Sequence, residues 1–254
     1  MTFERLPGGN LGGAVRIGDT VRRRVGPWTP SVAALLGHLE RKGFRGAPRF
    51  LGVDEQQREV LTFVDGETVG DMRPWPPWVY AEETLDQVAD WLREFHAAVA
   101  DFTPPPDAVW RFGRPHADGL IVGHNDAAPY NAVWRDGRLV AFIDWEFAAP
   151  VTPEWDLAFI AFSWVPLHAR DVVQAEGFSD FPARPARLVR LLRRYGWEGD
   201  PAAFVEVVRE RARSMADGLR SLAVAGDLDA LRLVAEGHAD SCERAAAELS
   251  DFSI

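Results

Sequence analysis

Two short polar motifs, separated by a predicted hairpin, limit most strongly how this chain can fold. The first is Gly-His-Asn-Asp-Ala-Ala-Pro-Tyr-Asn at residues 123–131, and the second is Ala-Phe-Ile-Asp-Trp-Glu at residues 141–146. The residues between them alternate around an Asp-Gly pair, which is typical of a β-hairpin turn. Because a hairpin brings its two ends together, Asn131 and Asp144 are predicted to be neighbours.

The motifs supply two carboxylates and one carboxamide, from Asp126, Asn131 and Asp144. Phosphoryl transfer from ATP uses such a set, because one carboxylate holds the attacking hydroxyl and accepts its proton, while a second carboxylate and an amide oxygen hold Mg²⁺. Each motif alone has a simpler interpretation, since Asp, Pro and Asn favour surface turns. The hairpin that joins them favours the chemical interpretation.

The motifs resemble those of the kinase-like small-molecule phosphotransferases, the aminoglycoside and choline kinase superfamily. In that family the catalytic loop reads H-x-D-x-x-x-x-N and the metal-binding aspartate lies in an I-D-W/F-E/G segment. The resemblance implies that Asp126 is the catalytic base, that Asn131 and Asp144 are metal ligands, and that His124 supports the loop.

A third motif, Trp-Asp-Leu-Ala at residues 155–158, matches the family's D-L-A segment at the start of a helix. The resemblance implies that Asp156 ties down the catalytic loop. An N-cap on its own helix is the alternative role for this side chain.

Before these motifs, the chain predicts a small β-rich region. Alternating residues indicate hairpins at 14–23 and 50–64, and a helix begins between them with Thr29 as N-cap and Pro30 in its first turn. After residue 82, helical spacing dominates. The resemblance implies an α+β, protein-kinase-like bilobal fold. Its parts would be an N-terminal nucleotide-binding lobe at 1–64, a hinge at 65–70 and a C-terminal catalytic and substrate lobe at 71–254.

The strand that should carry a phosphate-binding lysine has none. Strand alternation favours Arg23 as the replacement cation, with Arg22 as the alternative if the register differs. The acidic partner expected in the following helix is also missing, because residues 31–34 read Ser-Val-Ala-Ala.

Other nucleotide contacts follow from the same resemblance. Gly9 and Asn10, in a glycine-rich turn, would approach the phosphates through their backbone N–H groups. Phe63 and Val64, at the hinge, would meet adenine, and Val21 would form an apolar wall. An ordinary core role for these apolar residues fits the sequence equally well.

Charge and composition limit the kinds of binding partner and the cellular location that we expect for this protein. A net charge of −10 argues against nucleic acid. A single cysteine excludes an internal disulfide, and no long apolar run predicts a membrane span or signal peptide, so a cytoplasmic protein is expected.

The segment Gly-Asp-Thr-Val-Arg-Arg at residues 18–23, with Gly-Pro-Trp-Thr-Pro at 26–30, resembles the trifolitoxin-immunity-like subgroup of this family. The leading hypothesis is an ATP- and Mg²⁺-dependent phosphotransferase acting on a hydroxyl of a small molecule, such as an aminoglycoside-like antibiotic, a sugar or an amino alcohol. GTP is the alternative donor, and a non-catalytic binding or immunity protein is the alternative function.

Overall fold

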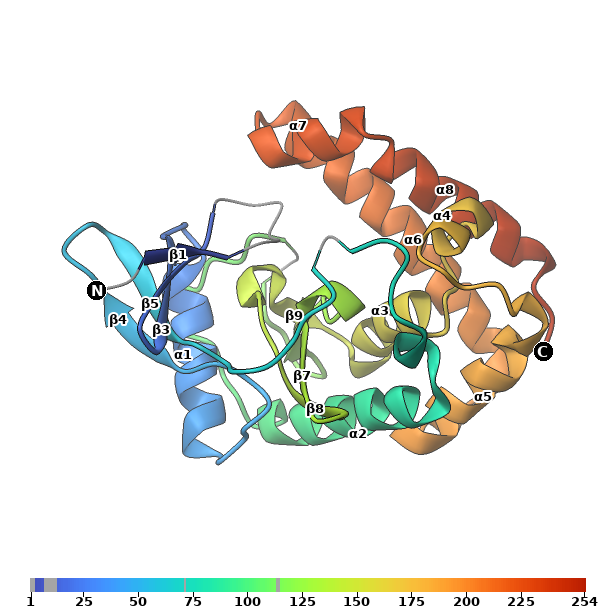
Figure 1. The fold of residues 1–254 in the computed structure, drawn as a ribbon, viewed down its shortest axis with the longest axis horizontal. Helices are drawn as coiled ribbons and strands as arrows, with labels where there is room; N and C mark the ends of the chain where they lie inside the picture. The colour runs from blue at the N-terminus through green and yellow to red at the C-terminus, as the bar shows by residue number, and fades with distance from the viewer. Residues whose placement is uncertain (1–2, 7–12, 71, 113–114) are drawn as a thin grey trace. The chain divides into compact units, whose positions relative to one another are not determined.

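A computed structural model describes residues 3–6, 13–70, 72–112 and 115–254 (Figure 1). The chain forms two compact units, each made of two separate segments. The first contains Met1–Asp71 and Trp91–Pro153, and the second contains Met72–Asp90 and Glu154–Ile254. These units are defined by internal packing. The lobe boundaries expected from the sequence, with a hinge at 65–70, stay a prediction.

The first unit contains a five-stranded antiparallel sheet with strand order β1-β2-β3-β5-β4. Both predicted hairpins are confirmed, and β1 at the edge is an additional strand that the sequence pattern did not predict. The strands are β1 (Phe3–Arg5), β2 (Val15–Ile17), β3 (Thr20–Arg24), β4 (Phe50–Val53) and β5 (Arg58–Thr62).

Helix α1 (Thr29–Arg41) follows β3 and buries the apolar stripe that its spacing predicts. The stripe consists of Val32, Leu35, Leu36 and Leu39. The prediction of Thr29 as N-cap is wrong, since Trp28 occupies that position and Thr29 begins the helix. The Thr29 hydroxyl instead accepts a hydrogen bond from the Gly26 amide at 3.0 Å.

The motif region of the first unit folds as two short sheets. The hairpin of β7 (Ala132–Arg135) and β8 (Arg138–Phe142) is confirmed, with Asp136 and Gly137 both at positive φ as a tight turn requires. A second pair, β6 (Ile121–Gly123) with β9 (Ala149–Val151), was not predicted. Two 3₁₀ turns, Pro129–Asn131 and Trp145–Phe147, lie at the ends of the hairpin.

The segment after β5 is tied to this hairpin. Glu67 and Trp134 form an isolated antiparallel bridge, with N–O distances of 2.7 and 2.8 Å in the two directions. Gly66 allows the close approach, because a Cβ at this position would lie 2.5 Å from the Trp134 carbonyl oxygen. No side chain other than hydrogen fits there without a backbone shift.

We expect Gly66→Ala to destabilise the first unit by about 2–3 kcal/mol, since the clash with backbone adds to the strain of its positive φ of 152°. Thermal unfolding followed by circular dichroism measures this effect. Gly18→Ala is the matched control, because Gly18 also has a positive φ but no atom lies within 4 Å of the place that a Cβ would take. Equal losses for the two variants would show that the Glu67–Trp134 bridge does not depend on Gly66.

The second unit is helical, and its predicted helices are confirmed apart from one. Predicted as a single helix, residues 228–249 are broken at Gly237, whose φ of 85° ends helical geometry between α7 and α8. The helices here are α3 (Pro153–Trp164), α4 (Arg170–Ala175), α5 (Arg184–Tyr195), α6 (Pro201–Val224), α7 (Leu228–Ala235) and α8 (His238–Glu248).

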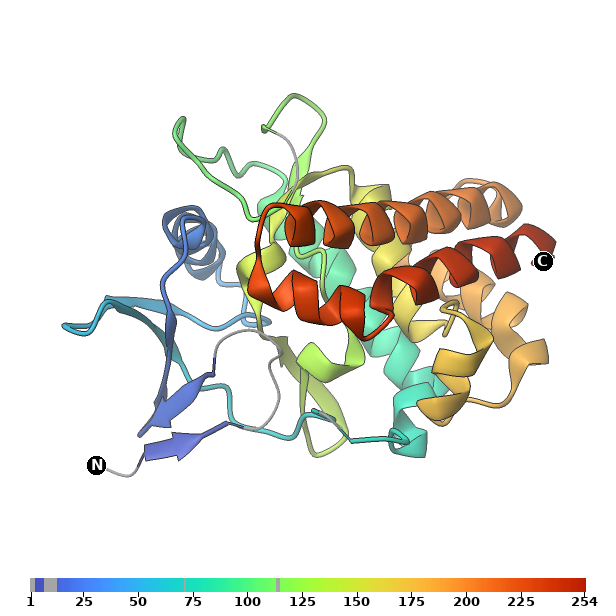
Figure 2. The same ribbon diagram turned by 90° about the horizontal axis from the view of Figure 1, so that it is seen from above.

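Helix α2 (Glu82–Val99) contributes its first half to the second unit and its remainder to the first. Its predicted apolar face is buried along the whole helix. In the second unit, α7 and α8 pack along α6, as both views show (Figure 2). Short 3₁₀ turns occupy Pro77–Tyr80, Phe181–Ala183 and Leu249–Asp251. In the described parts of the chain, no helix has the length and apolarity needed to cross a membrane.

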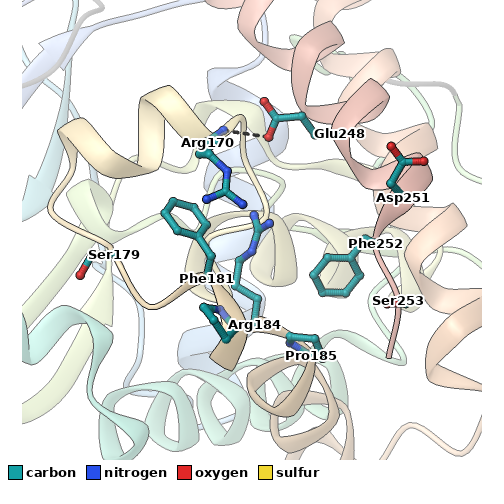
Figure 3. Close-up of a pocket in the computed structure, with 10 residues that line it drawn as sticks. Arg170, Ser179, Phe181, Arg184, Pro185, Glu248, Asp251, Phe252 and Ser253 are labelled. Atoms are coloured by element: carbon teal, nitrogen blue, oxygen red, sulfur yellow. Dashed lines mark hydrogen bonds between the residues drawn. The ribbon is translucent and has the colours of Figure 1, made fainter.

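A surface hollow of about 680 Å³ lies in the second unit (Figure 3). The Phe181 ring packs beneath the guanidinium groups of Arg170 and Arg184, at 3.9 and 5.0 Å from its centroid. Glu248 and Asp251 line the same hollow, so its lining carries both signs of charge. It contains none of the residues of the sequence motifs.

Candidate functional site

The two motifs meet at the open end of the β7–β8 hairpin, inside the first unit. The Ile143 amide donates to the Asn131 carbonyl oxygen at 2.9 Å, directly beyond the Ala132–Phe142 pair that closes the ladder. Asn131 and Asp144 therefore lie on adjacent segments, as the hairpin pattern predicts.

Both carboxylate oxygens of Asp126 accept hydrogen bonds. The Tyr130 hydroxyl donates to Oδ1 at 2.8 Å, and the Asn131 side-chain amide donates to Oδ2 at 2.8 Å and to the Asp126 carbonyl at 2.9 Å. Burial, followed by the charge of Asp144, raises the pKa of Asp126 well above its ordinary value, against the opposing effect of these hydrogen bonds. The carboxylate is thus held in one orientation and made more basic.

Asp144 lies at the hairpin exit with a left-handed backbone, at φ 65° and ψ 66°. This conformation is rare for residues other than glycine, and such strain concentrates at functional sites. It turns the chain directly into the 3₁₀ turn that follows. The Asp144 side chain is 22% exposed, and Arg23 contacts its Oδ1 at 2.8 Å.

Arg23 lies in a cluster of charged side chains, and Arg22 does not. The cluster consists of Arg23, Asp126, Asp144, Glu59, Glu146 and Arg111. Arg22 faces the opposite side of the sheet, where its Nε lies 3.3 Å from Asp54. The Arg23 guanidinium contacts three carboxylates, with Nε 3.3 Å from Glu59, Nη1 2.8 Å from Asp144 and Nη2 3.1 Å from Glu146. Burial lowers its pKa, but the charges of these three acids outweigh burial and raise it above the ordinary value.

Three residues of the cluster were missed by the sequence interpretation: Glu59, Glu146 and Arg111. Arg111 pairs with the other carboxylate oxygen of Glu146, and its guanidinium lies over the rings of Trp28 and Phe147, at 4.8 and 5.1 Å from their centroids. Burial and the charge of Asp144 raise the pKa of Glu146 to about 7, although both arginines oppose the shift. The sequence did offer a signal for Glu146, because this residue is the second acid of the Asp-Trp-Glu motif that contains Asp144.

His124 is fully buried beneath the loop. Its Nδ1 accepts a hydrogen bond from the Asp126 amide at 3.2 Å, and its ring centroid lies 4.4 Å from that of Trp145. These contacts connect the two motifs through the core, which is the geometry of a loop support. That role stays a prediction.

Asp156 belongs to the second unit, lies in the first turn of α3 and is buried. There, after the larger effect of burial, its charge contributes to raising the pKa of Tyr195 to about 12. Its predicted contact with the catalytic loop stays a prediction.

Of the predicted nucleotide contacts, Gly9 and Asn10 lie outside the described residues. Val21 pairs with Leu61 across β3 and β5, and Val64 is partly buried after β5. The Phe63 ring is covered by the Arg16 guanidinium, 3.6 Å from the ring centroid. Contact of these side chains with a nucleotide stays a prediction.

The cluster contains more carboxylates than guanidinium groups, so it is rich in oxygen atoms that can act as metal ligands. In the described part of the chain, Arg23 pairs with Asp144, Glu59 and Glu146, and Arg111 pairs with Glu146. Asp126 accepts hydrogen bonds from Tyr130 and Asn131. The described residues contain no group of three His, Cys, Asp or Glu side chains arranged to bind a metal by themselves. Mg²⁺ is commonly held by one or two protein oxygen ligands together with substrate phosphates. A site of this chemistry fits Mg²⁺ delivered with a nucleotide.

The sequence matches a known family profile and a known protein. The profile of the phosphotransferase enzyme family matches residues 107–204, a range that contains the loop, the hairpin and Asp156. The trifolitoxin immunity protein of Rhizobium leguminosarum bv. trifolii is 38% identical over 196 residues, which cover 75% of this chain and 73% of that protein. This chain belongs to the phosphotransferase enzyme family.

Solved structures with the same fold are much more distant in sequence. Aminoglycoside 2'-phosphotransferase-IIIa, in complex with GDP, is 15% identical, with a TM-score of 0.65 over 98% of this chain and 93% of that one. A choline/ethanolamine kinase family protein from Mesorhizobium loti is 17% identical, with a TM-score of 0.60 over 99% and 89%. They confirm the α+β, kinase-like fold of this phosphotransferase family member, with a small β-rich N-terminal part and a larger helical C-terminal part.

Proposed function

We propose that this protein transfers the γ-phosphoryl group of ATP to a hydroxyl of a small molecule, with Mg²⁺ as cofactor. The proposal depends on the arrangement at the hairpin end, where Tyr130 and Asn131 fix Asp126, and where the segment that leads into Asp144 is hydrogen-bonded to Asn131. Family membership supports small-molecule phosphoryl transfer in general.

In this proposal, Asp126 orients the acceptor hydroxyl and accepts its proton. The acceptor oxygen bonds to the γ-phosphorus as the bond to the bridging oxygen breaks, and the nucleoside diphosphate leaves. Positioning and electrostatics supply most of the rate in such reactions. The two hydrogen bonds that fix the Asp126 carboxylate serve the positioning, and the burial that raises its pKa favours acceptance of the proton.

Asn131 and Asp144 would hold Mg²⁺. Because Asn131 Nδ2 makes both of its bonds to Asp126, its amide oxygen is left to act as a ligand beside the Asp144 carboxylate. Bound Mg²⁺ would neutralise charge on the transferring phosphoryl group. Arg23, which already contacts Asp144, is the protein's own cation for the phosphates.

The acceptor and the choice between ATP and GTP are tested together. A panel of hydroxyl-bearing aminoglycosides, macrolides, sugars and amino alcohols is incubated with each nucleotide and Mg²⁺, and diphosphate release is followed. The panel includes aminoglycosides and macrolides because two proteins of similar fold are named aminoglycoside and macrolide phosphotransferases. Use of a nucleoside triphosphate agrees with the cytoplasmic location expected from the sequence.

The relative's name favours a second candidate, an immunity protein that binds its target without catalysis. The same name is also compatible with an enzyme that inactivates a toxin by phosphorylation. Nucleotide-dependent modification of a toxin or antibiotic, detected by a mass increase of one phosphoryl group, would favour the enzyme. Protection that persists in an Asp126→Ala variant would favour the binder.

Arg23→Ala is expected to weaken ATP binding or turnover about tenfold or more, because it removes the guanidinium from the Asp144 cluster. Arg24→Ala is the control, since Arg24 is the exposed next residue of the same strand. Calorimetric titration with Mg²⁺-ATP compares the two, and circular dichroism verifies folding. Equal, negligible effects would show that the phosphates are held by other groups.

A further inference from the structure

The acid that pairs with the phosphate-binding cation is expected on the helix after β3, and that helix has none at residues 31–34. The sheet itself supplies one. Arg23 in β3 lies directly opposite Glu59 in β5, and the Arg23 Nε is 3.3 Å from the Glu59 carboxylate. Because directly opposed residues on antiparallel strands share one face, this pair is built into the register of the sheet.

A hydroxyl of α1 also lies beside Glu59. The Glu59 side chain is only 8% exposed, and burial raises the pKa of its carboxyl, while the charge of Arg23 and the hydroxyl of Thr29, the first residue of α1, lower it. Thr29 is itself 3% exposed, and its oxygen accepts from the Gly26 amide at 3.0 Å. The helix therefore places a hydroxyl beside the acid, where a helix carboxylate was expected.

The two terminal nitrogens of the Arg23 guanidinium also contact carboxylates. While Nε meets Glu59, Nη1 and Nη2 meet Asp144 and Glu146. A planar guanidinium presents donors in several fixed directions, whereas a lysine ammonium is a single point charge on a flexible chain. Removing the contact at Nε leaves the plane of the Arg23 guanidinium defined by its Nη contacts alone.

We propose that Glu59 is the positioning residue for Arg23, and that it replaces the missing helix acid by aiming the guanidinium at the nucleotide phosphates. Glu59 touches Arg23 and not the nucleotide. The inference rests on the proposed function, because it assigns Arg23 to a nucleotide. It also implies that placement of the cation is set within the sheet, with α1 acting only through Thr29.

Calorimetric titration of Glu59→Gln, in the full chain with Mg²⁺, tests the proposal. The probes are adenosine and ATP, or guanosine and GTP if the wild type prefers GTP. We expect about tenfold weaker binding of the triphosphate and unchanged binding of the nucleoside, because only the phosphates meet Arg23. Glu55→Gln, exposed in the turn of the same hairpin, is the matched control.

A double-mutant cycle gives a readout that a merely structural role of Glu59 would not produce. If Glu59 acts through Arg23, Glu59→Gln should weaken triphosphate binding in the wild type but add nothing to Arg23→Gln. Additive losses in the cycle, or equal losses of nucleoside and triphosphate, would overturn the proposal.

Thr29 provides a second route if Glu59→Gln does not fold. Thr29→Val removes the hydroxyl beside Glu59 without changing any charge, and Thr29→Ser keeps it. We expect the valine variant to bind the triphosphate more weakly and the serine variant to behave as wild type. If the wild type binds triphosphate and Glu59→Gln or Thr29→Val binds it equally well, the role of Glu59 is wrong and the proposed function still stands. If the wild type binds no nucleotide, the proposed function fails first.

Discussion

Asp126→Ala is expected to reduce phosphoryl transfer by about 10² to 10⁴-fold, the range typical for losing a positioned general base. Binding of the Mg²⁺-nucleotide should change little, because in this account Asp126 orients the acceptor and is not a metal ligand. The two hydrogen bonds from Tyr130 and Asn131 that fix its carboxylate in the structure would be lost in the variant. Turnover with any accepted hydroxyl compound, measured beside calorimetric nucleotide binding, tests both halves of the prediction.

Asp126→Asn is the variant that controls for packing. It keeps the volume of the side chain, and its amide oxygen can still accept from Asn131 while its NH₂ group donates to the Tyr130 hydroxyl, but it removes the basic carboxylate. We expect turnover as low as in the alanine variant, with a smaller loss of stability. Retention of near-normal turnover in either variant would show that another group accepts the proton.

Asp144→Ala is expected to impair both nucleotide binding and transfer. It removes a charged oxygen ligand from a hard cation, and it also releases the Arg23 contact at 2.8 Å. We expect the Mg²⁺-dependent part of nucleotide affinity to be lost, with turnover too low to detect above background. Titrations of ATP with and without Mg²⁺ separate the two contributions.

Asp54→Ala is the matched control for this change. Asp54 also pairs with an arginine of β3, Arg22, but on the opposite side of the sheet. It should leave Mg²⁺-dependent binding intact. If Asp144→Ala bound Mg²⁺-ATP as well as Asp54→Ala did, Asp144 would not be a metal ligand.

Local sequence patterns were sufficient to predict the β7–β8 hairpin and the buried faces of α1 and α2. The β7–β8 pair follows from alternation around Asp136-Gly137, and the buried stripes of α1 and α2 follow from helical spacing. The break at Gly237 was missed because both α7 and α8 have helical periodicity, and one glycine inside such a pattern is often tolerated.

The contacts of Arg23 needed more than local pattern. Alternation within β3 favoured Arg23 over Arg22, but Glu59 becomes its partner only once β5 is paired with β3 in a particular register. Arg111 belongs to the same cluster although it lies in a segment without helix or strand, where no periodicity indicates which way a side chain points. In both cases the contact depends on which segments pack together in the folded chain, and residue type alone does not reveal it.

Calorimetric titration of the wild-type protein with ATP and with GTP, in the presence of Mg²⁺, tests the central claim most directly. We expect saturable binding of at least one of the two nucleotides, weaker binding when Mg²⁺ is removed, and loss of this Mg²⁺ dependence in Asp144→Ala. Absence of binding at millimolar nucleotide would contradict the assignment of a phosphotransferase site to Asp126, Asn131 and Asp144, and would leave the immunity or binding role in its place.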